Sequence, residues 1–163
     1  MSQINSSGNA RRRCREIMTG NVTTATREMS LREVAILMRD GDMGSVPVTE
    51  NKKLVGIVTD RDIVVRAVAE GKDAAMAKVS DVMTAEVFSV KAEDFVFEAI
   101  RLMGDRQVRR VPVTNESGEL VGIIAMADVA LETEDEREIA ETLEEISSGA
   151  GFWKKFSRTR FII

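Results

Sequence analysis

The chain has 163 residues and a formal net charge of -4, from 23 basic and 27 acidic side chains, so its length fits one domain or a compact pair of half-domains. This mildly acidic balance gives no general attraction to nucleic acid. The chain has no histidine and a single cysteine, Cys14. That composition excludes an intrachain disulfide, a cysteine metal cage and the serine–histidine or cysteine–histidine pairs of many hydrolases.

Residues 1–15 are expected to form an N-terminal tail and the start of a short helix. This helix is expected over Arg11 to Met18 and leads into the first repeat. Two interpretations of Cys14 stay open: its arginine neighbours lower the thiol pKa and make it reactive, or the thiol is unremarkable. The N-terminus has no apolar signal core, and no apolar run approaches the roughly 20 residues of a spanning helix. The cytoplasm is therefore the expected compartment.

The chain repeats itself. Leu54–Asp62 returns as Leu120–Asp128. Val-Pro-Val occurs at Val46–Val48 and again at Val111–Val113, and Met-Thr occurs at Met18-Thr19 and again at Met83-Thr84. In both cases the spacing between the copies is one residue shorter than that between Leu54 and Leu120. An internal repeat outranks other sequence signals. It predicts a first unit over 16–72, a linker over 73–80 and a second unit over 81–131.

Each repeat has the same expected order of elements. A short strand (22–25; 87–90) precedes a helix with an apolar stripe, then a strand around a proline, a polar turn (50–53; 115–118), a second strand (54–58; 120–124) and a closing helix. The stripes are Leu31, Val34, Ala35 and Met38, and Val96, Ala99, Ile100 and Met103. The expected fold is α+β, with two pseudo-symmetric β-α-β-β-α units packed face to face.

The closing helices are apolar on nearly every side. Between Ile63 and Ala69 only Arg66 is polar, and Met126 to Leu131 repeats the feature with one aspartate. A helix that is apolar all round needs a partner on more than one face. The pattern therefore predicts a homodimer, which would give a flat disc.

The junction between the second strand and the closing helix is the candidate site. Thr59 and Asp62 fit a capping box, which would make their role purely structural. Three features favour a functional role: Gly56 permits a close approach to the backbone, the helix N-terminus offers N–H groups to a phosphate, and a carboxylate there can take both ribose hydroxyls.

A second element is the pair Arg109-Arg110, just before the second Val-Pro-Val. Either it is a solvated charge pair, or one arginine clamps a phosphate with its fork of donors. The first repeat has Gly44-Ser45 at this place. The two repeats are thus similar in fold but not in charge.

The doubled unit, with Val-Pro-Val and Leu-Val-Gly-Ile-Val-Thr-Asp-Arg-Asp, resembles a tandem pair of CBS domains, and more narrowly the small stand-alone bacterial CBS-pair proteins. The resemblance covers Glu16 to Leu131. It implies an adenosine-nucleotide site in which Asp62 holds the ribose hydroxyls and Thr59 lines the same site. It further implies that Ile57, Val87 and Phe88 sandwich the adenine, and that Arg109 and Arg110 approach the phosphates.

The resemblance also implies a weaker second site formed by Val22, Thr23, Ile123 and Asp128. This site departs from the family pattern at Ala125, where a hydroxyl is missing, and it faces Gly44-Ser45 rather than arginines.

Residues 132–163 form a separate C-terminal region in sequence. An acidic helix is expected over 132–145, followed by a basic, aromatic segment over 152–163 that contains the sole tryptophan, Trp153. That segment could contact an anionic membrane surface or single-stranded nucleic acid, or fold back on the acidic helix or a partner subunit.

The leading hypothesis is a non-catalytic, homodimeric sensor that binds AMP, ADP or ATP and signals to an unknown protein partner. S-adenosylmethionine ranks lower because the arginines favour a phosphate over a sulfonium, and NAD is also ranked below AMP, ADP and ATP. No cofactor, metal or nucleic acid is expected. The alternative is a ligand-free scaffold that acts through its dimer surface and tails. A third hypothesis, a nucleotide hydrolase, lacks an obvious base, since only carboxylates, lysines and Cys14 are available.

Overall fold

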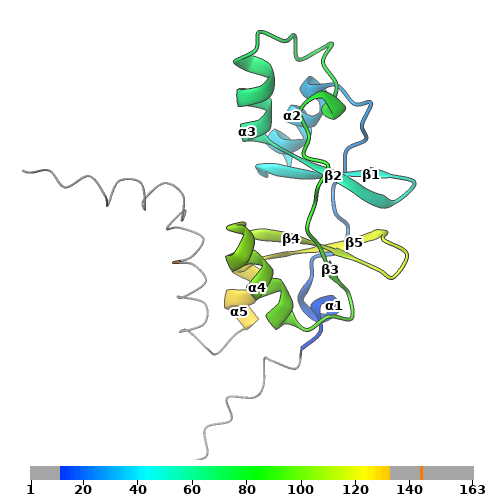
Figure 1. Cartoon of the computed structure of the whole chain (residues 1–163), viewed down its shortest axis with the longest axis vertical. Helices are drawn as coiled ribbons and strands as arrows, with labels where there is room; N and C mark the ends of the chain where they lie inside the picture. The colour runs from blue at the N-terminus through cyan, green and yellow to red at the C-terminus, as the bar shows by residue number, and fades with distance from the viewer. Residues whose placement is uncertain (1–11, 133–143, 145–163) are drawn as a thin grey trace, which may run out of the picture. The chain divides into compact units, whose positions relative to one another are not determined.

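The computed structural model describes residues 12–132 and 144 (Figure 1). The chain divides into two compact units. One, here called the Asp62 unit, consists of Gly20–Phe88 and Thr114–Val121; the other, the Asp128 unit, contains the described residues of Met1–Thr19, Ser89–Val113 and Gly122–Ile163. Both units combine helices with a small sheet whose successive strands are neighbours, which confirms the α+β class. Within the described part of the chain, no helix has the length and apolarity needed to cross a membrane.

The Asp62 unit packs helices against a two-stranded hairpin. Helix α2 (Leu31–Asp40) starts with a capping box, in which the Ser30 hydroxyl accepts from the Glu33 N–H at 3.2 Å and the Glu33 carboxylate accepts from the Ser30 N–H at 2.7 Å. Leu31, Val34 and Met38 are buried, as their spacing predicts. Ala35 is exposed, so the predicted apolar stripe is one residue narrower.

Strands β1 (Ser45–Glu50) and β2 (Lys53–Thr59) pair antiparallel through a two-residue turn. Asn51 and Lys52 both have positive φ, 50° and 67°, as the favoured tight hairpin turn requires. The predicted strand over 22–25 is reduced to a single parallel bridge, between Ala25 and Val48. Figure 1 shows α2 and α3 on one side of this hairpin.

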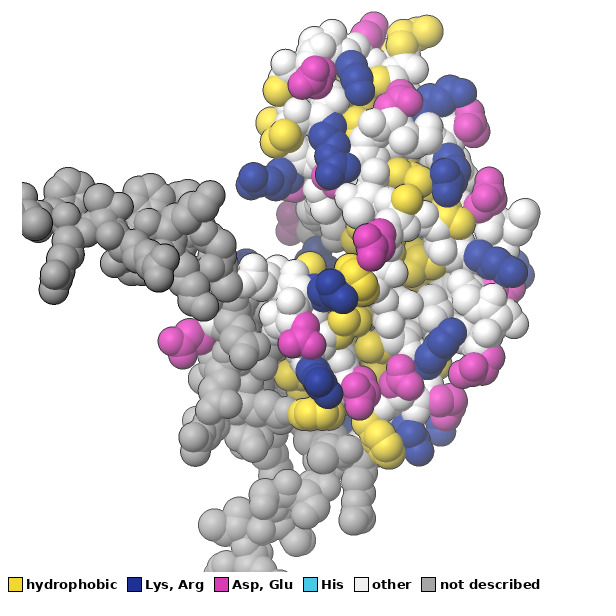
Figure 2. Space-filling view, in the orientation of Figure 1, with side chains coloured by type: hydrophobic (Ala, Val, Ile, Leu, Met, Phe, Trp, Pro, Cys, Tyr) yellow, Lys and Arg dark blue, Asp and Glu magenta, His cyan; other side chains and the backbone are white. Residues whose placement is uncertain are grey.

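The first closing helix begins as α3 (Asp60–Ile63) and continues as the π-helix η2 (Val64–Val68). Ile63 and Ala67 are buried in the core of the unit, whereas Val64, Val65 and Val68 are 57%, 52% and 63% exposed. Hydrophobic side chains are visible on the surface over this helix in Figure 2. A short 3-10 helix, η3 (Val79–Asp81), then adds Val79 to the core.

The Asp128 unit repeats the order with a three-stranded sheet. Strands β3 (Val90–Lys91), β4 (Arg110–Thr114) and β5 (Leu120–Ala125) are ordered β3-β4-β5, and the end of β4 and the start of β5 are counted with the Asp62 unit. Helices α4 (Val96–Arg106) and α5 (Met126–Glu132) complete it. The predicted stripe of α4 is fully confirmed, because Val96, Ala99, Ile100 and Met103 are all buried. The predicted strand over 87–90 is replaced by β3, which shares only Val90 with it.

The N-terminal helix α1 (Cys14–Ile17) belongs to the Asp128 unit. The N–H groups of Cys14 and Arg15 donate to the carbonyls of Asp94 and Ala92, at 2.9 and 3.0 Å. The helix therefore precedes the first repeat in sequence, as predicted, but packs with residues of the second. The backbone carbonyls just before α4 find their donors in α1, which explains this placement.

Candidate functional site

Thr59 and Asp62 stand where β2 ends and α3 begins, and they form the predicted capping box. The Thr59 hydroxyl accepts from the Asp62 N–H at 3.0 Å, and Asp62 Oδ2 accepts from the Thr59 N–H at 3.0 Å and from its hydroxyl at 2.7 Å. The capping role is therefore present. It uses one carboxylate oxygen, however, and the Asp62 side chain is only 15% exposed.

The other oxygen of Asp62 faces an arginine that the sequence did not single out as a site residue. Arg66 Nη1 lies 3.6 Å from Asp62 Oδ1, one helical turn away. The same nitrogen donates to the Val82 carbonyl at 2.7 Å and lies 3.5 Å from the Thr84 hydroxyl. Arg66 thus joins the start of the closing helix to a segment that lies beyond the linker in sequence.

Ile57 is paired with Thr84. Each backbone N–H donates to the other residue's carbonyl at 2.9 Å. A Cβ on the neighbouring Gly56 would meet Met83 Sδ at 2.9 Å and the Thr84 carbonyl at 3.1 Å. The close approach predicted for Gly56 is real, and the group that approaches is the chain itself.

The same contact occurs in the Asp128 unit. Thr19 and Ile123 exchange backbone hydrogen bonds at 2.8 and 3.0 Å, and a Cβ on Gly122 would lie 2.5 Å from Met18 Sδ. The repeated Met-Thr dipeptide is therefore the partner of the repeated glycine. The repetition of Met-Thr in the sequence is the signal that could have indicated this contact of Thr84, although no role was predicted for the dipeptide.

Of the seven residues predicted for the first site, the Asp62 unit contains five. Ile57, Thr59 and Asp62 lie on β2 and α3; Val87 and Phe88 follow the Ile57–Thr84 pair by a few residues, with Val87 half-buried and Phe88 37% exposed. Arg109 and Arg110 are exposed at the start of β4, in the Asp128 unit. Their approach to a ligand at Asp62 stays a prediction.

The predicted second site has half of the same capping arrangement. Asp128 Oδ2 accepts from the Ala125 N–H at 2.8 Å, but alanine has no hydroxyl to add the second bond. Ile123 is held by Thr19, while Val22 and Thr23 belong to the Asp62 unit. The Asp128 carboxylate is consequently less firmly held than that of Asp62.

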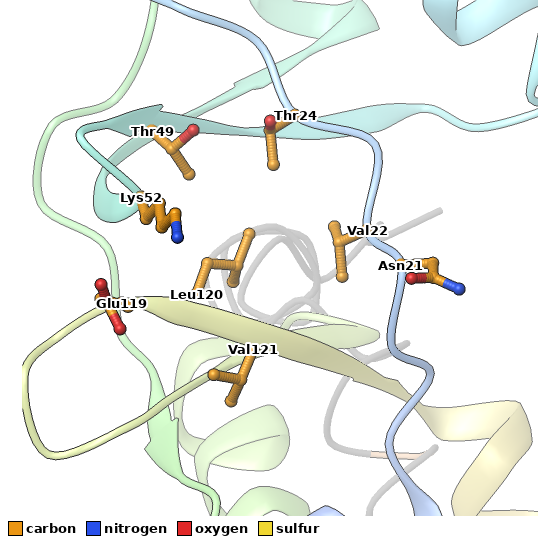
Figure 3. Close-up of a pocket in the computed structure, with 8 residues that line it drawn as sticks. All are labelled: Asn21, Val22, Thr24, Thr49, Lys52, Glu119, Leu120 and Val121. Atoms are coloured by element: carbon orange, nitrogen blue, oxygen red, sulfur yellow. The ribbon is translucent and has the colours of Figure 1, made fainter.

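The Asp62 unit also has a pocket of about 400 Å³ at the hairpin end of its sheet (Figure 3). Val22 and Leu120 project into it, and Lys52 points its ammonium group toward it. None of Ile57, Thr59 and Asp62 lines this pocket, so it is separate from the Asp62 carboxylate. Its lining residues are Asn21, Val22, Thr24, Thr49, Lys52, Glu119, Leu120 and Val121.

Cys14 is fully buried, and its arginine neighbours do not activate it. Desolvation raises the pKa of the thiol from 9.0 to about 12, and the carboxylates of Asp94 and Glu98 add to the rise. The thiol lies 3.6 Å from the Phe95 carbonyl, to which it can donate only when protonated. The hypothesis of a reactive cysteine was therefore wrong.

We expect native Cys14 to react with a thiol reagent at pH 8 roughly a hundredfold or more slowly than in the unfolded chain, because only the thiolate is nucleophilic. The folded pKa is raised, so the protonated thiol stabilises the fold below pH 9 and this contribution is lost as the pH rises from about 9 to about 12. Reaction rates in buffer and in urea measure the first effect. Fast labelling of the folded protein would contradict the burial.

The described residues contain no group of three or more cysteine, aspartate and glutamate side chains placed to hold a metal ion. Around Asp62 they supply a carboxylate that accepts hydrogen bonds and the backbone pair of Ile57 and Thr84.

Comparison with known proteins gives a family. The model described as CBS domain matches twice, over residues 14–68 and 79–135. The chain is 35% identical over 133 residues to the CBS domain-containing protein YhcV of Bacillus subtilis, and the match covers 82% of this chain and 94% of YhcV. Such a relative has little sequence outside the matched region.

Two solved structures extend the comparison. The structure of Hypoxic Response Protein I with two coordinated zinc ions has a TM-score of 0.69 and 35% identity, covering 75% of this chain and 99% of that one. The CBS domain pair of protein MJ0100, in complex with 5′-methylthioadenosine and S-adenosyl-L-methionine, has a TM-score of 0.65 and 24% identity, covering 74% and 94%. The MJ0100 comparison shows a shared fold alone.

Proposed function

Because the chain belongs to the CBS-domain family, with two CBS domains in tandem, we propose that it is a non-catalytic regulatory module that binds an adenine nucleotide at Asp62 and signals to a partner protein. The observation that carries this proposal is the Asp62 carboxylate. Oδ2 accepts two hydrogen bonds from Thr59, and Oδ1 makes one long ion pair, with Arg66. The oxygen that faces Arg66 is the one left to accept hydrogen bonds from the ribose hydroxyls, and the bonds from Thr59 fix the orientation of the carboxylate.

The proposed ligand class takes its example from a solved structure that shares the fold. MJ0100 binds 5′-methylthioadenosine and S-adenosyl-L-methionine, which share an adenosine group. For this chain we propose AMP, ADP or ATP, because the exposed Arg109 and Arg110 favour a phosphate over a sulfonium. Ile57, Val87 and Phe88 would supply the apolar contacts to the base.

The second site, around Asp128, is proposed to bind more weakly. The hydroxyl that Thr59 provides is absent at Ala125, so the carboxylate has one fewer donor to orient it.

Isothermal titration calorimetry of the full chain with AMP, ADP, ATP, S-adenosylmethionine and NAD tests the proposal. We expect one dominant site per chain, with a nucleotide that carries phosphate binding more tightly than S-adenosylmethionine. The absence of heat and of any thermal shift with all five compounds would remove the nucleotide function.

The alternative function, a scaffold that acts through a dimer surface, is favoured by a separate observation. Val64, Val65 and Val68 are more than half exposed in the single chain, on a helix whose other side is buried. We propose that a second copy of the chain covers this face and that the dimer forms a flat disc.

The predicted membrane contact of 152–163 lies outside the described residues, as does nearly all of the predicted acidic helix over 132–145.

Replacing Val65 by glutamate should convert the proposed dimer to a monomer, because a charge would be buried in an apolar contact. Sedimentation equilibrium measures the mass. Met76→Glu is the control, since Met76 is 78% exposed in the same unit but lies outside this helix. A wild-type protein that stays monomeric at about tens of micromolar would reject a dimer with a micromolar or lower dissociation constant.

A further inference from the structure

Arg66 reaches two parts of the Asp62 site at once. Its Nη1 donates to the Val82 carbonyl at 2.7 Å and lies 3.4 Å from that of Met83. It also lies 3.5 Å from the Thr84 hydroxyl and 3.6 Å from Asp62 Oδ1. Three of these four groups belong to the segment that pairs with Ile57 and continues toward Val87 and Phe88.

The other hydrogen bonds of Asp62 and Thr84 do not make the same connection. Asp62 Oδ2 is held by Thr59, within the same turn, and Thr84 is held by backbone bonds to Ile57. The Arg66 guanidinium, by contrast, connects the two regions. It makes an ion pair with the Asp62 carboxylate at the helix start and donates to the Val82 carbonyl in the segment that leads to the proposed adenine contacts.

The second repeat has a different residue type at this position in the sequence. The shift along the chain that relates Asp62 to Asp128 places Glu132 at the position of Arg66. A glutamate carboxylate has no proton to donate to a backbone carbonyl at neutral pH. The repeats therefore differ at this position as well as at Thr59 and Ala125.

We propose that Arg66 is the positioning residue of the Asp62 site: it holds the Asp62 carboxylate and the Val82–Thr84 backbone in one fixed arrangement, so that ribose and base are received together. This inference rests on the proposed adenine-nucleotide function. Arg66 acts on the ribose end through Asp62 and does not contact phosphate.

The test compares Arg66→Met and Arg66→Lys with the wild type, using adenosine, AMP and ATP as ligands under conditions where all variants are folded. Arg66→Met should weaken binding on the order of tenfold, by a similar factor for all three ligands, since charged hydrogen bonds contribute about that much. Arg66→Lys should recover part of the affinity because it keeps the charge but not the fork of donors. Arg32→Met is the matched control, an exposed arginine on α2 in the same unit.

Two results would overturn the inference. Unchanged affinity in Arg66→Met, with only a lowered melting temperature, would make Arg66 a structural residue. A loss that grows from adenosine to AMP to ATP would make it a direct phosphate ligand.

A ligand-free measurement separates this inference from the proposed function. Amide hydrogen exchange at Ile57 and Thr84 should be faster in Arg66→Met than in wild type, and unchanged in Arg32→Met. If the wild type binds none of the three ligands, the nucleotide function and a role for Arg66 in it both fail. If the wild type binds them but exchange at Thr84 is unaffected by Arg66→Met, the proposed function survives and the positioning role falls.

Discussion

Asp62→Asn is expected to weaken adenine-nucleotide binding on the order of a hundredfold or more. The ribose hydroxyls need two acceptors, and each charge-assisted hydrogen bond contributes about 1.5–3 kcal/mol. An asparagine side chain keeps one acceptor oxygen but replaces the other with an NH₂ group, which meets Arg66 with like polarity. Calorimetry with the tightest ligand from the wild-type panel gives the ratio of dissociation constants.

The control must separate capping from binding, because Asp62 also caps α3. Asp94→Asn serves this purpose: Asp94 Oδ2 accepts from the Lys91 N–H at 2.7 Å in a similar, partly buried local arrangement in the Asp128 unit. We expect both variants to lose some stability and Asp62→Asn alone to lose affinity. Equal affinities for the two variants would mean that Asp62 is only a cap.

Gly56→Val is expected to destabilise the fold by about 1–3 kcal/mol or more, although valine is the better strand former. The strand at Gly56 has no room for a branched side chain. Its first carbon would already lie 3.1 Å from the Thr84 carbonyl, which is backbone, and 2.9 Å from Met83 Sδ. Urea unfolding monitored by circular dichroism measures the change.

Gly20→Val is the matched control for Gly56→Val. A Cβ at Gly20 has no neighbouring atom within 4 Å, and Gly20 does not have a positive φ. Its stability should change by less than about 0.5 kcal/mol. A Gly56→Val protein as stable as the wild type would show that residues 83–84 do not approach β2 as closely as described.

Local patterns in the sequence predicted the local parts of this structure. Thr59-x-x-Asp62 gave a capping box because its partners are close together in the chain, and the apolar spacing of α4 gave a buried face. The polar run over 50–53 gave the hairpin, although the turn itself is only two residues long. In each case the interacting residues are neighbours in the chain, so their types and spacing suffice.

Contacts between distant residues were not predictable in the same way. Arg66 was noted only as the polar exception on an apolar helix, yet its nearest hydrogen-bond partner is the Val82 carbonyl. Nothing in the spacing of Arg66 and Val82 indicates that bond, because it depends on how the chain returns after the linker. The same reason explains the mistake at Cys14, where burial of the thiol, with the carboxylates of Asp94 and Glu98, raises the pKa although arginines are near in sequence.

The division of the two units does not follow the boundary between the repeats, and this has a consequence for synthesis. Thr114–Val121 comes from the second repeat but completes the Asp62 unit, where the Leu54 N–H donates to the Gly118 carbonyl and the Leu120 N–H to that of Lys52. A nascent chain that ends at residue 88 still lacks these partners for β2. The Asp62 unit is therefore completed only after residues 114–121 have been synthesised, and a polypeptide that contains the first repeat alone would lack these two hydrogen bonds.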